Sequence, residues 1–418
     1  MKNPFSSLFT SLVICLFAQP ALKAKTILSD GDFVAVCGDS ITEQRRYSVY
    51  LEQYLMMCQP QLNLSAMQLG WGGERADGFG RRIESHVLPF NPSVVTLCYG
   101  MNDGNSSAIS DEIRTRYRES LTDAVRQLKA ANVRVIVVGS PGVVDPATYK
   151  GRVSAEVYNH TLAELAEIAR AVAASEEVLF ADVYSVMMES MLKAKEALGE
   201  DYRIANDGIH PNHNGHLAMT YAFLKALGVD GDIGTLRVDW EKQRAWGSDA
   251  HEILNFENGQ LEVESSRYPF CLDGSADSTG SFAMSAFLPF NQELNRYLLI
   301  VENAPAEVRV TWGRNSRIYT SKQLADGVNL AADFSESPFK QAYNQVTKSI
   351  YEQQKFEVDT VKAGMGALQK LSKLSGADAY VDGLRGLVVS QDAALRTVAR
   401  SQLRPVRHQL ILETIQSN

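Results

Sequence analysis

The stretch Phe33-Val34-Ala35-Val36-Cys37-Gly38-Asp39-Ser40 decides the fold, because an apolar run ends abruptly in a glycine, a carboxylate and a hydroxyl. A continuous apolar run is typical of a strand that is buried on both faces of a parallel sheet. Similar runs lie at 62–69, 93–99, 133–138 and 178–183, and amphipathic helical segments lie between several of them. This alternation predicts a parallel sheet enclosed between two layers of helices.

Polar residues follow several of these runs. Ser40 comes directly after the first strand, Gly73 after the second and Asn102 after the third, while Asp207 and His210 precede the last helix of this region. In open parallel sheets, binding sites form beyond the carboxyl ends of the strands. A serine, an exposed glycine backbone, an amide and an Asp–His pair on one rim indicate acyl-transfer chemistry.

These residues resemble the four signature blocks of the SGNH hydrolase superfamily, the GDSL-type esterases and lipases. The blocks occur in the family's order, as Gly38-Asp39-Ser40, Gly73, Gly-Met-Asn-Asp at 100–103 and Asp207-Gly-Ile-His210. The resemblance covers residues 27–228 and implies a three-layer α/β/α, flavodoxin-like fold. The glycine of the second block is assigned to Gly73 and not to its neighbour Gly72, because Glu74 follows it and because of the spacing to Arg81-Arg82-Ile83. The chain contains no Gly-x-Ser-x-Gly, so the nucleophile-elbow fold does not match.

The resemblance implies a catalytic triad of Ser40, His210 and Asp207. A serine hydroxyl needs a base to take its proton, and imidazole does this at neutral pH. Asp207 would orient the imidazole through its other ring nitrogen. The resemblance also implies an oxyanion hole made of the backbone N–H groups of Ser40 and Gly73 and the side-chain amide of Asn102.

Each residue also has a simpler interpretation. Ser40 alone would serve as a helix cap, and Asp207-Gly208 as an ordinary turn. His210, His213 and His216 suggest a metal site, but their spacing progresses around a helix, and a metal would compete with His210 as base. The sequence therefore predicts no metal and no cofactor.

Three other residues each allow two interpretations. Trp71, beside the glycine block, either stacks on a sugar ring or fills the core. Tyr149 and Lys150 either line the pocket or belong to a solvated loop.

Composition excludes several classes of protein. The 418 residues are 45% hydrophobic and 22% charged, which fits a globular protein with a core. Lys+Arg 41 against Asp+Glu 49 gives a net charge of −8, which argues against a nucleic-acid partner. The cysteines at 37, 58, 98 and 271 form no Cys-x-x-Cys pair, and buried free thiols are favoured over disulfides, although pairing stays open.

The first 24 residues have the pattern of a secretory signal peptide. Lys2 precedes an apolar run from Leu8 to Ala18, which is too short to span a bilayer. The sequence therefore predicts export to the periplasm or the extracellular space, with no membrane span in the rest of the chain.

The predicted organisation has four parts: a signal peptide at 1–24, the SGNH hydrolase domain at 25–228, a small sandwich-like β domain at 229–334 and a helical region at 335–418. The helical region should pack on the rest of the chain, because its apolar face must be covered. We expect its helices to break near Gly364-Met365-Gly366 and at Gly376.

The substrate is the least determined feature. An exported member of this superfamily with an added β domain most resembles bacterial carbohydrate O-acetylesterases. The sequence thus predicts an O-acetylated carbohydrate as the partner. Two alternatives remain: a lipid or short-chain acyl esterase of the lysophospholipase kind, and a catalytically silent carbohydrate-binding protein.

Overall fold

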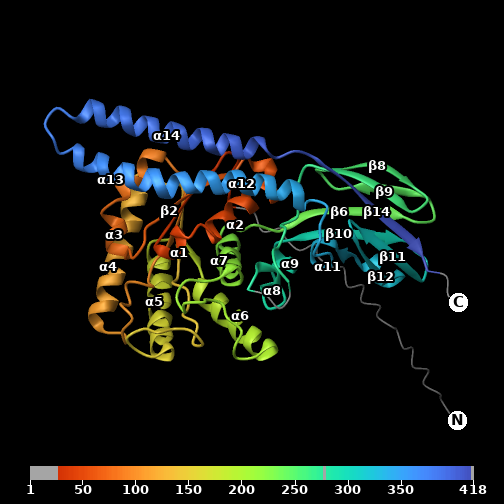
Figure 1. Cartoon of the computed structure of the whole chain (residues 1–418), viewed down its shortest axis with the longest axis horizontal. Helices are drawn as coiled ribbons and strands as arrows, with labels where there is room; N and C mark the ends of the chain where they lie inside the picture. The colour runs from red at the N-terminus through yellow and green to blue at the C-terminus, as the bar shows by residue number, and fades with distance from the viewer. Residues whose placement is uncertain (1–26, 276–278, 416–418) are drawn as a thin grey trace, which may run out of the picture.

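The computed structural model describes residues 27–275 and 279–415, so the expected signal peptide lies outside the described residues (Figure 1). The N-terminal half contains a five-stranded sheet in the order β2-β1-β3-β4-β5, with every neighbouring pair parallel. Gly38, Gly70 and Cys98 pair across three adjacent strands, so these strands end at one edge. The strands are β1 (Phe33–Gly38), β2 (Ser65–Gly70), β3 (Val94–Cys98), β4 (Val135–Gly139) and β5 (Leu179–Ala181).

The two faces of the sheet belong to separate hydrophobic clusters. Val34 and Val36 pack in one cluster, whereas Ala35 and Cys37 pack in the other, because successive side chains of a strand point to opposite faces. One face is covered mainly by α2 (Tyr47–Gln53), α6 (Val183–Leu198) and α7 (His213–Ala226), and the other by α3 (Ala76–Gly80), α4 (Asp111–Ala130) and α5 (Ala155–Ser175). The predicted three-layer fold is confirmed.

Two further sheets form the β region that the sequence predicts. One has the order β13-β10-β6-β7 and the other the order β12-β11-β14-β9-β8. They pack against each other through Tyr297, Trp312 and His408, whose rings are in contact. Their strands are β6 (Asp232–Asp239), β7 (Arg244–Gly247), β8 (His251–Glu257), β9 (Gln260–Ser265), β10 (Arg296–Glu302), β11 (Glu307–Trp312), β12 (Asn315–Thr320), β13 (Val328–Asn329) and β14 (Val406–Thr414).

The C-terminal region is helical, with two differences from the prediction. The chain runs through α12 (Lys340–Phe356), a π-helical turn at Glu357–Val361, α13 (Lys362–Leu371) and α14 (Asp378–Ser401). Helix α13 continues through Gly364 and Gly366, so the expected break there is wrong; Gly376, at φ +78°, lies in the connection between α13 and α14. The last described segment is the strand β14, between β9 and β11, and is not helical.

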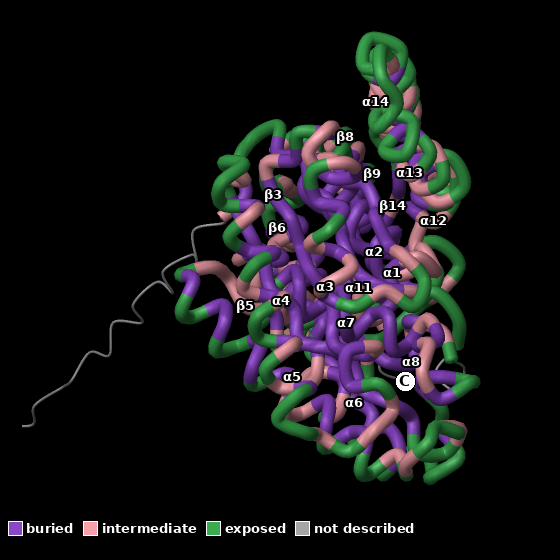
Figure 2. Tube along the Cα trace, turned by 90° about the vertical axis from the view of Figure 1, so that its left-hand side faces the viewer, coloured by how far each residue is buried: buried purple, intermediate pink, exposed green. Residues whose placement is uncertain are grey.

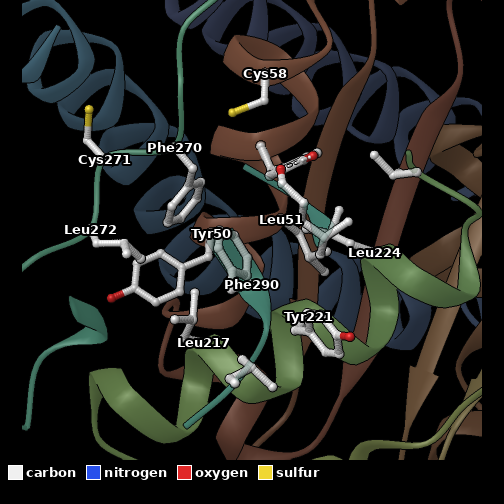
Figure 3. Close-up of a cluster of buried hydrophobic side chains, with 14 of the residues drawn as sticks. Tyr50, Leu51, Cys58, Leu217, Tyr221, Leu224, Phe270, Cys271, Leu272 and Phe290 are labelled. Atoms are coloured by element: carbon white, nitrogen blue, oxygen red, sulfur yellow. Dashed lines mark hydrogen bonds between the residues drawn. The ribbon is translucent and has the colours of Figure 1, made fainter. Parts of the chain in front are cut away.

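The C-terminal half is in extensive contact with the α/β layers. Helices α12 and α14 run side by side from the β sheets across the α/β part (Figure 1). Below them, Tyr50 of α2 packs edge-on against Phe270, which also contacts Phe290 (Figure 3). The tip of the α13–α14 hairpin projects from the body and is exposed (Figure 2). The boundaries of the predicted domains stay a prediction.

The remaining short helices are α1 (Ser40–Glu43), α8 (Ser281–Met284), α9 (Phe290–Glu293), α10 (Ser321–Asp326) and α11 (Leu330–Asp333). The described chain also has π-helical segments at Tyr54–Cys58 and Ile83–Val87 and 3-10 segments at Pro60–Leu62 and Leu88–Phe90. The cysteines at 37, 58, 98 and 271 are buried free thiols. Within residues 27–275 and 279–415, no helix has the length and hydropathy needed to cross a membrane.

Candidate active site

Ser40 lies where β1 gives way to α1. Asp39 follows the strand in an extended conformation, and its carboxylate accepts a hydrogen bond of 2.9 Å from the N–H of Ile41. This cap starts α1 at Ser40. The nucleophile candidate is therefore held at the carboxyl edge of the sheet, as the sequence predicts.

The structure brings the three predicted triad residues together. His210 Nε2 lies 2.9 Å from Ser40 Oγ, and His210 Nδ1 lies 2.7 Å from Asp207 Oδ2. An ionised carboxylate only accepts hydrogen bonds, so Nδ1 carries the proton and Nε2 is left to accept from the serine hydroxyl. This is the arrangement in which a histidine can act as general base.

Asp207 is fixed by its own turn. Its Oδ1 accepts hydrogen bonds from the backbone N–H groups of Ile209, at 2.9 Å, and His210, at 2.8 Å. Partial burial alone would raise the pKa of Asp207, but these bonds and the His210 side chain lower it below its ordinary value. The carboxylate therefore stays ionised throughout the neutral range.

The turn that carries Asp207 is supported at Gly208 and by an ion pair between Asp145 and Lys195, two residues that the sequence did not single out. Gly208 has φ +83°, and a Cβ there would overlap the backbone of Tyr149. Buried Asp145 accepts a hydrogen bond of 2.8 Å from the N–H of Ile204 and pairs with buried Lys195 at 3.1 Å. This ion pair fixes the start of the segment that leads to the triad.

The Asp207 turn reaches the rim by a different route from the other three blocks. The Asp207 block does not directly follow a strand, because helix α6 lies between the end of β5 and the turn. The turn still reaches the rim through the isolated bridge between Ala205 and Pro211 and through Arg46, which donates a hydrogen bond of 3.0 Å to the Pro211 carbonyl.

The glycine block forms a turn anchored by a buried ion pair. Gly73 has φ +73°, and a Cβ there would meet no atom within 4 Å, so its backbone faces open space. The next residue, Glu74, accepts three hydrogen bonds from Arg82, the shortest at 2.7 Å, and one of 2.7 Å from Tyr99. The ion pair between Glu74 and Arg82 therefore holds the Gly73 turn in place.

Asn102 connects the glycine turn to the nucleophile. Its Nδ2 donates to the Glu74 carbonyl at 3.0 Å and to the Asp39 carboxylate at 3.3 Å. The neighbouring Asp103 is buried and accepts from the N–H groups of Ala76 and Gly100, which ties the third block to the start of α3. The segments that carry Ser40, Gly73 and Asn102 are thus hydrogen-bonded to one another.

The other histidines near the triad have structural contacts. His216 is buried, accepts from the N–H of Tyr47 at 3.2 Å and lies 3.1 Å from Gln44 Oε1. His213 lies 2.7 Å from the Tyr50 hydroxyl. In the described part of the chain, no group of three His, Cys, Asp or Glu residues is arranged to hold a metal ion.

A cavity of about 1160 Å³ opens beside Gly73 and Asn102. One wall is the segment from Trp71 to His86, and the other is helix α13 with the turn before it. Trp71 is half-buried; the Lys362 ammonium lies 4.8 Å from its ring centroid, and the His86 ring packs against it at 5.4 Å. Tyr149 stacks on Tyr158 at 5.7 Å and does not line this cavity.

Comparisons with known proteins agree with this architecture. Residues 36–218 match the model of the GDSL-like lipase/acylhydrolase family. A gut microbial diltiazem-metabolizing enzyme has a structure similar over 94% of this chain and 100% of its own, with a TM-score of 0.73 and 20% identity. An acetylxylan esterase from Geobacillus stearothermophilus is similar over 48% of this chain and 96% of its own, with a TM-score of 0.40 and 21% identity. The search of curated proteins found no match.

The parallel sheet, the residues at its rim and the family match together define a class. Through residues 36–218 the chain belongs to the SGNH hydrolase superfamily, in its GDSL-type branch. It is an ester hydrolase.

Proposed function

We propose that the protein removes O-acetyl groups from carbohydrate through a Ser40–His210–Asp207 triad. The observation that carries the proposal is the continuous line of hydrogen bonds from Ser40 Oγ through the imidazole to the Asp207 carboxylate. In this mechanism His210 takes the hydroxyl proton as Ser40 attacks the ester carbonyl, and the resulting imidazolium then gives that proton to the leaving sugar oxygen, which departs as the alcohol. Water releases acetate from the acyl-enzyme by the reverse sequence.

The oxyanion of the tetrahedral intermediate would be bound by the backbone N–H groups of Ser40 and Gly73 and by Asn102 Nδ2. Such preorganised donors contribute roughly 3–4 kcal/mol each to the barrier reduction. The bond from Asn102 to Asp39 is long, at 3.3 Å, so an oxyanion at this site would compete for that N–H. The backbone at Gly73 is open to a ligand.

The cavity supports a polar alcohol component in the substrate. Its lining contains arginine, lysine, aspartate and asparagine side chains, and few large apolar ones. A site for a long acyl chain needs a mostly apolar wall. The lining therefore supports a sugar ester over a lipid ester as the substrate. The lipid ester remains the second candidate.

A silent binding protein would not need the aligned triad. Export to the periplasm or beyond also remains part of the proposal.

The triad is tested with Ser40→Ala. A fluorophosphonate probe should label the wild type on Ser40, and the variant should lose both labelling and ester hydrolysis. Activity retained in the variant would exclude a serine mechanism. A series of chromogenic esters, run beside acetylated xylan, separates the substrates: acetate-specific release supports the carbohydrate ester, whereas rates that rise with acyl length support the lipid ester.

A further inference from the structure

The cavity beside Gly73 and Asn102 is strongly charged. Its lining includes five cationic side chains and two carboxylates, namely Arg75, Arg81, Arg82, Lys362, Lys370, Glu74 and Asp77. Burial and the nearby Arg82 lower the pKa of His86, which also lines the cavity, to about 4, so this imidazole is neutral at pH 7. The lining is thus cationic, although the whole chain has a net charge of −8.

Ion pairs account for only part of this positive charge. Arg82 is neutralised by Glu74, and Lys362 by Glu43 of α1. Two guanidinium groups, those of Arg75 and Arg81, share the single carboxylate of Asp77. 

Lys370, in the last turn of α13, is exposed and has no ion-pair partner among the described residues. The lining therefore keeps one uncompensated positive charge on each wall, at the Arg75–Arg81–Asp77 group and at Lys370.

The two positive sites come from segments that are distant in sequence. The Arg75–Arg81 site belongs to the glycine turn and α3, whereas Lys370 is supplied by the C-terminal helices. Helix α13 packs against this rim at Gly366, where a Cβ would lie 3.8 Å from His86 Nε2, in ordinary van der Waals contact. Lys362 joins α13 to Glu43, three residues after the nucleophile candidate. The C-terminal helix is thereby fixed as a wall of the site.

We propose that this cavity binds an anionic carbohydrate ester, with an acidic group of the sugar chain held between Arg75, Arg81 and Lys370 while the acetyl ester lies at Gly73 and Asn102. The proposal rests on the proposed function and adds its substrate class. Guanidinium groups suit planar carboxylates and tetrahedral sulfates alike, so either kind of acidic sugar fits. The three residues are specificity-determining, and none of them contacts the reacting carbonyl.

The position of the charges predicts a particular kinetic signature. They contact a part of the substrate that does not react, so they bind the ground state and the transition state equally and lower KM without changing kcat. Because the side chains are exposed, salt screens them. We expect wild-type KM for an acidic oligosaccharide ester to be roughly five- to tenfold lower than for a neutral one at low salt, and the difference to shrink in 0.3 M NaCl.

The test compares O-acetylated oligogalacturonate, O-acetylated sulfated galactan oligosaccharide and O-acetylated xylo-oligosaccharide. Lys370→Gln and Arg81→Gln should each raise KM for the acidic esters severalfold and leave hydrolysis of p-nitrophenyl acetate unchanged. Lys193→Gln, which removes one exposed positive charge from α6, is the matched control and should alter none of these values. Comparing the carboxylated with the sulfated substrate shows which of the two acidic groups the cavity binds.

A binding measurement distinguishes a failure of this inference from a failure of the proposed function. Calorimetry with unacetylated trigalacturonate and xylotriose should show binding of the acidic sugar only, and binding should weaken in Lys370→Gln. Acetyl hydrolysis with equal KM for acidic and neutral esters would overturn the inference alone. If no ester were hydrolysed but trigalacturonate bound as expected, the proposed function would fail and the anionic-sugar site would stand.

Discussion

The side-chain amide of Asn102 makes two hydrogen bonds, and each has a different role. Its amide holds the Glu74 carbonyl at 3.0 Å, which fixes the turn that contains Gly73. Its weaker bond to Asp39, at 3.3 Å, lies beside the nucleophile candidate. Burial raises the pKa of Asp39 to about 7, although the N–H of Ile41 lowers it in part. The amide thus contacts a carboxyl group that changes charge near neutral pH.

Asn102→Ala should lower kcat by roughly 10²–10³-fold with little change in KM, because its N–H acts mainly on charge that develops in the transition state. Steady-state kinetics on p-nitrophenyl acetate measures this effect, and a melting curve shows whether the fold is kept. An effect confined to KM would mean that Asn102 binds substrate instead.

The individual residues of the site differ in how far the sequence could predict them. Asp207 and His210 lie three residues apart, so one local turn brings them into contact, and Ser40 directly follows a recognisable strand. Asp145 and Lys195 carry no such local pattern. Their pairing depends on how the loop after β4 meets the end of α6, which is a tertiary contact. The sequence could not predict it.

At the scale of elements, the C-terminal helices and the π-helical turn at Glu357–Val361 meet α2 and β2 through buried polar groups. Glu52 accepts a hydrogen bond of 2.8 Å from Gln354, and Glu357 accepts one of 2.7 Å from the N–H of Gln68. Asp392 of α14 completes a group of three buried carboxyls, and its Oδ1, like Glu52 Oε1, has no hydrogen-bond partner in the described structure. Burial raises the pKa of Glu52 to about 8, with the Asp392 charge adding to the effect.

This shift makes stability depend on pH. In the unfolded chain Glu52 ionises near pH 4.5, whereas in the folded protein it stays protonated to about pH 8. The contribution of Glu52 to the stability of the folded protein is therefore complete below pH 4.5, and it is lost as the pH rises to about 8. We expect this contribution to the free energy of unfolding to fall by roughly 1 kcal/mol between pH 7 and pH 9. Glu52→Gln should remove that part of the slope in urea titrations at both pH values.

Glu189→Gln, on the exposed side of α6, is the matched control and should keep the wild-type slope. Equal slopes for wild type and Glu52→Gln would show that Glu52 is already ionised in the folded protein. The range from pH 7 to 9 avoids the histidines, because in the unfolded chain they are already neutral above about pH 7.

The helical tail shows where element prediction failed. In β14, His408, Leu410 and Leu412 are buried and Val406 is partly buried, at every second position, so a strand pattern was present in the sequence. It was obscured because its partners, β9 and β11, lie far earlier in the chain. At Gly364 and Gly366 the glycines do not mark a helix end, because α13 continues through both of them.

At the scale of the whole molecule, the chain crosses between its two halves more than once. It leaves the α/β layers at β6, forms most of the β sheets, returns across the α/β part as α12 to α14, and ends in the β sheets as β14 (Figure 1). Tyr54 of the α/β half donates a hydrogen bond of 2.6 Å to the Leu294 carbonyl, and Tyr221 donates one of 2.6 Å to Glu293. The buried aromatic cluster around Phe270 joins the same surfaces (Figure 3).

A fragment that ends at Gly228 should therefore be poorly soluble or much less stable than the full chain. It would expose the apolar surfaces of Tyr50 and Tyr54 that Phe270 and Phe290 now cover, and it would leave Glu52 without Gln354. Each large aromatic side chain that loses its cover costs about 1.5–3 kcal/mol, which is a large share of a typical domain's stability. The measurement is soluble yield and a thermal melt beside the full chain. A fragment that expresses well, melts cooperatively and hydrolyses p-nitrophenyl acetate at the full-length rate would show that the C-terminal half is a separable module.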